Sequence, residues 1–191
     1  MRETVPDDAQ LIQSVVDGDA AAFGDLVQRY QDRLFNSLVH AVGSREEAED
    51  VAQEAFVMAF RKLGTFQRQS AFYSWLYRIA RNVAISRHRR QRPVCLAPES
   101  LDAATPRTRD VTSQPVAELE RKETVAQIRL ALSRLHEEHR TILILREIDG
   151  CDYETIGLTL ELPIGTVRSR LFRARQELRE LLREVNQQEN A

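Results

Sequence analysis

The spacing of the apolar residues constrains the fold of this chain more than any other feature. Apolar residues recur at intervals of three and four rather than two, and the 191 residues include only seven glycines. This periodicity is typical of amphipathic α-helices, whereas half-buried strands alternate at every second residue. Gly18, Gly43 and Gly64 each follow a periodic stretch and mark helix ends. The sequence therefore predicts an all-α fold.

Two serines mark helix starts. Ser44 stands three residues before Glu47, which is the spacing of a capping box, and Ser70 is a candidate N-cap for a helix from Ala71 to about Arg90. The apolar period then predicts helices that begin near residues 11, 23, 45, 71, 116, 137, 153 and 164, the last of them running to about 184.

A proline-rich stretch divides these helices into two groups. Residues 91–116 carry four of the six prolines, among Thr, Ser and mixed charge, and show no apolar period. This composition is typical of a flexible linker. We therefore expect two small helical domains, 1–92 and 117–191, joined by a linker at 93–116.

Charge and aromatic residues are unevenly distributed. The 44 residues from Ala55 to Pro98 contain no Asp or Glu, but they hold nine basic residues and seven of the twelve aromatics. Arginine neutralises phosphate and an aromatic ring stacks on an unpaired base, so this window suits nucleic acid. An acidic cluster that cannot face DNA comes directly before it: Glu46, Glu47, Glu49, Asp50 and Glu54. Together they suggest an adaptor between a protein machine and DNA.

Helical projection assigns faces within this window. The residues expected in the core of the helix at 71–90 are Phe72, Leu76, Ile79 and Val83, and those expected on the opposite, nucleic-acid face are Tyr77, Arg78, Arg81, Ile85, His88 and Arg89. Trp75 lies between the faces and is expected to be a core or rim aromatic. Phe56, Phe60 and Leu63 are expected in the core behind the acidic helix, with Arg87 to Arg92 trailing toward phosphate.

Bulk properties exclude several classes of protein. The formal net charge of −2 does not argue against nucleic acid, because local distribution decides binding. Cys95 and Cys151 lack metal-ligand spacing, so no metal, cofactor or disulfide framework is expected. No apolar run approaches the length of a membrane span, and the N-terminus lacks a signal-peptide core. A cytoplasmic protein without membrane insertion is expected.

Residues 152–175 have the spacing of a helix-turn-helix. Ile156 and Leu160 supply the inner face of the first helix, and Gly157 leaves room where a second helix crosses closely. The buried stripe of the second helix is expected to be Val167, Leu171, Ala174 and Leu178.

Subtracting this stripe leaves Arg168, Ser169, Phe172 and Arg173 on one exposed face. A helix that reads the major groove needs this arrangement, with Arg toward guanine, Ser toward either base and an apolar ring toward a thymine methyl. The alternative is a basic amphipathic helix that packs on a partner. Arg170 and Arg175 point elsewhere, toward phosphate or toward Glu177 and Glu180.

Several motifs carry a family resemblance. Residues 165–175 (GTVRSRLFRAR), preceded by 145–150 (LREIDG) and 153–156 (YETI), resemble region four of extracytoplasmic-function (ECF, group 4) sigma factors of the sigma-70 family. Residues 47–56 (EAEDVAQEAF) resemble the polymerase-binding helix of region two, and 70–82 (SAFYSWLYRIARN) its promoter-melting and −10-reading helix. The departures are small: His136 replaces a frequent proline, and Gly157 replaces a common alanine.

The resemblance implies a bacterial transcription initiation factor rather than an enzyme. It would bind core RNA polymerase, recognise the duplex −35 and single-stranded −10 promoter elements, promote melting, and be held by an anti-sigma factor. The implied polymerase-docking residues are Asp50, Gln53 and Glu54. The implied −10 residues are Phe66, Ser70, Arg78, Arg81, Asn82 and Arg89, with the loop at 66–71 capturing a flipped base. The implied −35 residues are Thr166, Arg168, Ser169, Phe172 and Arg173.

Other readings remain open at this point. A helix-turn-helix regulator that acts on duplex DNA without docking on polymerase explains the C-terminal motif but not the acidic helix beside the basic aromatic one. A metal-dependent phosphodiesterase using the acidic cluster is disfavoured, because helical projection spreads those carboxylates around the helix. The cluster can also be a solvated helix N-terminus, which the helix dipole favours.

Overall fold

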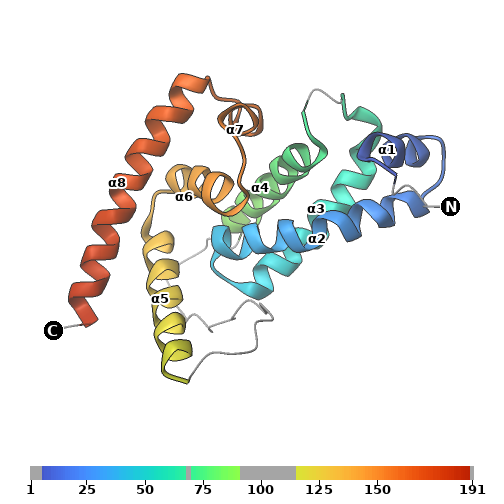
Figure 1. Ribbon diagram of the computed structural model, residues 1–191. Helices are drawn as coiled ribbons and strands as arrows, with labels where there is room; N and C mark the ends of the chain where they lie inside the picture. Colours follow the sequence, from blue (N-terminus) through green and yellow to red (C-terminus); the bar gives the residue numbers. More distant parts are fainter. Residues whose placement is uncertain (1–5, 68–69, 91–114, 190–191) are drawn as a thin grey trace.

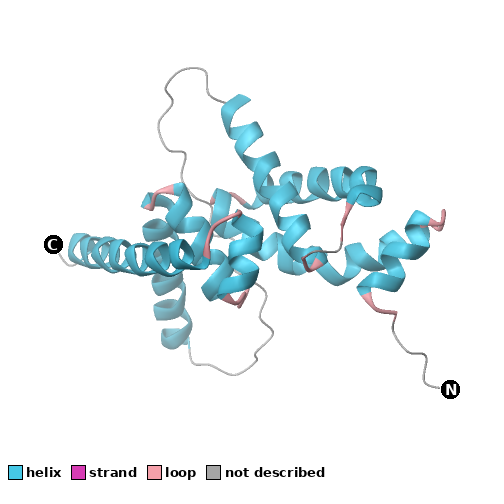
Figure 2. Ribbon diagram, turned by 90° about the horizontal axis from the view of Figure 1, so that it is seen from above, coloured by secondary structure: helices cyan, strands magenta, loops and turns pink. Residues whose placement is uncertain are grey.

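The computed structural model describes residues 6–67, 70–90 and 115–189, and within these ranges every regular element is a helix (Figures 1 and 2). The elements of the N-terminal half are α1 (Asp8–Val16), α2 (Ala21–Val42), α3 (Arg45–Lys62), a 3-10 turn (Leu63–Thr65) and α4 (Phe72–Arg90). Those of the C-terminal half are α5 (Pro115–Arg134), α6 (Glu137–Leu143), a π-helical turn (Ile144–Ile148), α7 (Tyr153–Leu160) and α8 (Ile164–Glu189). The predicted all-α class is confirmed.

Local sequence signals set the helix ends of the N-terminal half. Gly43 ends α2 in the left-handed region at φ 80°, which a residue without a side chain adopts easily. Ser44 then caps α3 by accepting a hydrogen bond from the Glu47 backbone N–H. Ser70 is not the residue that opens α4: the Ala71 carbonyl accepts the first helical hydrogen bonds, and the helix begins at Phe72.

The N-terminal helices enclose an apolar core. Helices α2, α3 and α4 pack on one another, and α1 covers α2. The predicted inner face of α4 is confirmed, because Phe72, Leu76, Ile79 and Val83 are all buried, and Trp75 is buried beside them. The predicted core residues Phe56 and Leu63 also lie inside, together with Val51 and Ala55 of α3.

The C-terminal half contains the predicted helix-turn-helix. Glu161 ends α7 in the left-handed region at φ 57° and turns the chain toward α8. A Cβ atom on Gly157 would stand 2.9 Å from the Leu162 carbonyl oxygen, so glycine permits the turn to lie this close to α7. Val167, Leu171 and Ala174 are buried as predicted. His136, which replaces a frequent proline, caps α6 by accepting from the Glu138 N–H.

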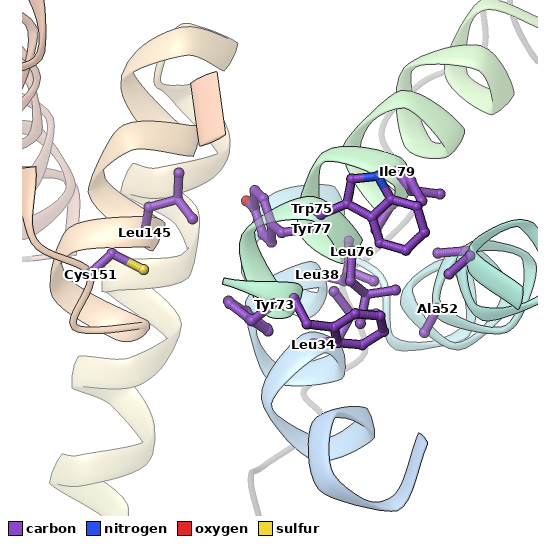
Figure 3. Packing of buried hydrophobic residues seen from close by; sticks show 14 of the residues in the cluster. Leu34, Leu38, Ala52, Tyr73, Trp75, Leu76, Tyr77, Ile79, Leu145 and Cys151 are labelled. Carbon is purple, nitrogen blue, oxygen red and sulfur yellow. The ribbon is translucent and has the colours of Figure 1, made fainter. Parts of the chain in front are cut away.

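The two halves pack against each other. Helix α7 lies beside α4, and the π-helical turn and α5 lie against α2 (Figure 1). Leu145 and Cys151 belong to the same continuous cluster of buried residues as Tyr73 and Tyr77 of α4, toward which they point in Figure 3. Helix α5 begins at Pro115, inside the segment expected to be linker; the other linker residues, 93–114, lie outside the described ranges.

Candidate nucleic-acid interface and partner-binding groove

The outward face of α8 is cationic and apolar at once. Arg168, Ser169, Phe172 and Arg173 are exposed together, as helical projection predicted. The Phe172 ring is 62% exposed, although a ring of this size is normally buried. Within the described parts of the chain, neither Arg168 nor Arg173 forms an ion pair. Thr166 is half-buried, and its carbonyl accepts from the Ser169 hydroxyl at 3.1 Å.

Two other arginines of α8 face the protein. Arg170 pairs with Glu138 at 3.0 Å and Arg175 with Glu147 at 2.6 Å. The expected partners, Glu177 and Glu180, are wrong for both. Helix α6 packs along α8 and brings Glu138 to Arg170, and the π-helical turn brings Glu147 to Arg175. These pairs fix the back of α8 and leave its outward face available.

The outer face of α4 is divided between solvent and the C-terminal half. Asn82 and Arg89 are exposed. Arg78 pairs with Glu161 at 2.7 Å, and Arg81 pairs with Glu137 at 3.3 Å. Both glutamates belong to the C-terminal half, so the two arginines already have anionic partners.

Tyr77 is not exposed on this face as helical projection predicted. Only 2% of it is accessible, because the C-terminal half covers that side of α4. Burial, and more weakly the negative charge of Asp149, raise the pKa of its hydroxyl well above the ordinary value. Helical projection could not predict the burial of Tyr77, because it considers only the packing of a helix within its own domain.

The loop before α4 is partly packed. Phe66 is half-buried, with its ring centroid 5.1 Å from that of Trp75 and 6.0 Å from that of Phe72. Ser70 is also half-buried. Residues 68–69 of the expected base-capturing loop lie outside the described ranges.

The acidic side chains of α3 have a cationic neighbour. Arg87 of α4 pairs with Asp50 at 2.5 Å and with Glu54 at 3.3 Å. The expectation that Arg87 trails toward phosphate is therefore wrong, because α4 packs along α3 and brings Arg87 onto these carboxylates. Gln53, between them in sequence, is exposed.

A groove runs between α2 and α3 on the side of Gln53. Its volume is about 920 Å³, and its walls include Phe23, Val27, Phe35, Gln53, Val57 and Phe60. Phe60, which the sequence predicted in the core, is 44% exposed and leans on Phe23 at a centroid distance of 5.1 Å. The sequence did hold a signal, since Gln53, Val57 and Phe60 follow helical spacing on the face opposite the core stripe.

Neither metal sites nor membrane spans occur in the parts described. Among these residues no group of three or more His, Cys, Asp or Glu side chains can hold a metal ion. None of the described helices has the length and apolar character needed to cross a bilayer. Cys151 is a free, buried thiol whose pKa burial raises.

Known proteins resemble the chain over nearly its full length. The RNA polymerase sigma-H factor of Pseudomonas aeruginosa is 42% identical over 192 residues, covering 95% of this chain and 99% of that protein. The ECF RNA polymerase sigma factor SigW of Bacillus subtilis is 36% identical over 186 residues, covering 91% and 96%. The ECF RNA polymerase sigma-E factor of Escherichia coli K12 is 38% identical over 178 residues, covering 90% and 92%.

Solved structures share the fold. CnrH, in its complex with the cytosolic domain of CnrY, superposes with a TM-score of 0.66 at 27% identity, covering 91% of this chain and 96% of that one. The sigma factor RpoE, in its complex with the anti-sigma factor NepR from Bartonella quintana, also gives 0.66, at 24% identity over 84% of this chain and 96% of that one.

Each of the two helical domains carries a cationic face, and the C-terminal domain contains a helix-turn-helix. Together these features define a two-domain DNA-binding protein. The family model for sigma-70 region 2 matches residues 26–94, and that for sigma-70 region 4 matches residues 126–178. The chain belongs to the extracytoplasmic-function sigma factors of the sigma-70 family.

Membership of this family establishes the general function of the protein. The protein is an RNA polymerase sigma factor, and regions 2 and 4 imply binding to core polymerase and to promoter DNA. The alternative of a regulator that acts without polymerase is not favoured, because the region 2 match extends over the acidic and the basic aromatic helices. The matched relatives are sigma factors, which are not enzymes.

Proposed function

We propose that this sigma factor works in the cytoplasm by docking on core polymerase through α3, engaging the single-stranded −10 element through α4 and reading the duplex −35 element through α8. Residues 1–92 would act as region 2 and residues 117–191 as region 4, with 93–116 linking them. The observation that carries the proposal is the exposed face of α8, where an accessible phenylalanine stands among arginines that have no anionic partner within the described residues.

The chemistry of that face matches base edges in the major groove. Arg168 and Arg173 can each donate two hydrogen bonds to guanine O6 and N7, and Ser169 can donate or accept. Phe172 offers the apolar surface that a thymine methyl requires. Thr166 lies in the first turn of α8, where its backbone favours a phosphate contact.

The −10 role of α4 is supported by its exposed polar residues and by the absence of carboxylates on the helix. Asn82 has the donor and acceptor pair that reads a base edge, and Arg89 supplies charge toward phosphate. Phe66 and Ser70 border the loop proposed to hold a flipped base. Arg78 and Arg81 can also contact the −10 strand once Glu161 and Glu137 no longer pair with them.

Docking on polymerase is proposed to combine carboxylates with the apolar groove. Asp50, Gln53 and Glu54 supply the polar contacts, while Val57 and Phe60 offer accessible apolar surface beside them. A polar rim around an apolar centre is the usual anatomy of a protein interface. Arg87 neutralises part of the acidic charge, so we assign the groove a large share of the binding energy.

An anti-sigma factor is proposed as a further partner. The support is the structural similarity to the sigma factor RpoE, which was solved in complex with the anti-sigma factor NepR.

Run-off transcription with core polymerase on a genomic library tests the proposal and reveals the promoter sequence. Val57→Glu should abolish transcription and competition for core polymerase, because it places a charge in the groove. Val16→Glu is the matched control, since Val16 is a valine of similar exposure (53% against 46%) on α1, outside the groove. Unchanged competition by Val57→Glu would reject the groove as the docking surface.

A further inference from the structure

The cationic character of α8 continues beyond the residues proposed to read the −35 element. Helix α8 is continuous from Ile164 to Glu189, and it packs along α5 (Figure 1). Arg179 and Arg183 are exposed on its C-terminal part. The match to the region 4 family model ends at residue 178, so the family resemblance assigns these two arginines no role.

Helical spacing places both arginines on the reading face of α8. Arg179 follows Arg168 by eleven residues, and Arg183 follows Phe172 by the same interval. Eleven residues complete about three helical turns, so each arginine stands within roughly 20° of its counterpart around the helix axis. The opposite side of this part of the helix is buried at Val185. The exposed face proposed to read bases therefore continues into two further cations.

The carboxylates of this part of α8 lie along a different edge of its exposed side. Glu180 and Glu184 are exposed, and each directly follows one of the two arginines. Each therefore stands roughly 100° further around the helix axis. A DNA backbone that approaches along the Arg168 edge meets Arg179 and Arg183 before it meets a carboxylate.

Neither an ion pair nor the helix dipole accounts for Arg179. Among the residues that the structure describes, Arg179 and Arg183 form no ion pair. The dipole favours cations only within the last turn of a helix, and Arg179 precedes the end of α8 at Glu189 by ten residues. Its guanidinium group is therefore available to an anion outside the chain.

The dimensions of the major groove place the DNA backbone near these arginines. At the rise of an α-helix, Arg179 lies roughly 10 Å beyond Phe172 along the axis, and Arg183 lies roughly 16 Å beyond it. The major groove is about 12 Å wide. A helix that crosses the groove with Phe172 at the base edges therefore brings Arg179 to the phosphates of the groove wall and Arg183 just past them. The donors of a guanidinium group match the oxygens of a phosphate.

We propose that Arg179 and Arg183 bind backbone phosphates beside the −35 element and extend the DNA contact of α8 past the bases that it reads. The inference rests on the proposed −35 role of α8. Phosphate contacts carry no direct sequence information. The two arginines therefore strengthen binding by the same factor on every sequence, and they make binding more dependent on salt.

The salt dependence of DNA binding by the full-length protein tests this proposal. Arg179→Ala with Arg183→Ala is compared with wild type by fluorescence anisotropy, on a −35 duplex from a promoter mapped by run-off transcription and on a scrambled duplex. Loss of two phosphate contacts should reduce the slope of log Kd against log salt by ~2. The advantage of wild type over the double variant should then be about tenfold larger at 50 mM than at 200 mM salt, by the same factor on both duplexes.

Two control variants separate phosphate binding from general charge. Arg179→Lys with Arg183→Lys retains both cations and should keep the slope close to that of wild type. Arg134→Ala removes one exposed arginine at the end of α5, which packs against α8, and should leave the slope unchanged. Its matched counterpart is Arg179→Ala alone, which should reduce the slope by ~1. All these side chains are exposed, so an unchanged Tm is expected for each variant.

A wild-type slope in the double alanine variant would overturn the inference, and Arg173→Ala then shows what has failed. If Arg173→Ala relaxes specificity at one base pair, α8 reads the −35 element and only the phosphate contact is absent. If neither Arg173→Ala nor Phe172→Ala affects binding to the −35 duplex, the −35 role fails, and the inference with it. Wild-type DNA binding by the double variant, together with weaker run-off transcription, would assign the two arginines to an acidic surface of polymerase instead.

Discussion

Two exposed phenylalanines on different domains allow the proposed DNA and polymerase contacts to be separated. Phe172 is 62% exposed on the reading face of α8, and Phe60 is 44% exposed in the groove of α3. We expect Phe172→Ala to weaken binding to −35 duplex DNA while leaving polymerase binding intact. Phe60→Ala should weaken polymerase binding and leave −35 binding intact.

The exposed areas set the size of both effects. A phenylalanine presents about 150–250 Å², so Phe172 offers roughly 90–155 Å² to DNA and Phe60 roughly 65–110 Å² to polymerase. At about 25 cal/mol per Å², complete coverage contributes ~2–4 kcal/mol for Phe172 and ~1.5–3 kcal/mol for Phe60. Phe60→Ala should also lower the free energy of unfolding by about 1–2 kcal/mol, because the ring packs on Phe23.

Fluorescence anisotropy with −35 duplex measures the first effect, and competition against labelled wild-type protein for core polymerase measures the second. A tenfold or larger rise in Kd for the −35 duplex is expected for Phe172→Ala, with an unchanged Tm. Wild-type affinity of Phe172→Ala for that duplex, or equal loss on a scrambled duplex, would refute base contact by the ring. Wild-type competition by Phe60→Ala would refute the groove.

Further outcomes concern single residues of the other surfaces. Arg173→Ala should cost about 1–3 kcal/mol at one base pair and relax specificity there, whereas equal loss on all sequences would reduce Arg173 to a phosphate contact. Asn82→Ala should impair promoter opening, seen by permanganate reactivity of unpaired thymines, more than it impairs −35 binding. Where Asp149 packs against the N-terminal half, burial raises the pKa of its carboxyl more than hydrogen bonds and Arg33 lower it. Protonation therefore favours this packing of the two halves: the stabilisation is complete below the ordinary pKa of about 4 and is lost as pH rises through the raised value. The radius of gyration should then increase with pH, and Asp149→Asn should remove the dependence.

Local signals in the sequence predicted the fold well because each acts within a few residues. Gly43 and Ser44 end one helix and begin the next through backbone conformation and a hydrogen bond three residues away. The exposed face of α8 followed from the helical period, since Val167 and Leu171 identified the buried side.

Contacts between distant segments could not be predicted in this way. Tyr77 was placed on an exposed face, but the C-terminal half buries it. Arg87 was assigned to phosphate, but it pairs with Asp50, 37 residues earlier in the chain. Phe60 is predicted in the core behind the acidic helix, but its position on α3 faces a groove. The errors for Tyr77 and Arg87 depend on which helices become neighbours, and helical periodicity does not contain that information. The exposed face of α3 that includes Phe60 was within reach of helical periodicity.

The continuous core that joins the two halves has a thermodynamic consequence. Tyr73 and Tyr77 pack in one cluster with Leu145 and Cys151, so neither half can unfold in the free protein without exposing apolar surface of the other. Heating should therefore melt the free chain as a single calorimetric unit, with van't Hoff and calorimetric enthalpies in agreement. Any complex that holds the halves apart loses this shared heat effect, and its two domains should melt at separate temperatures.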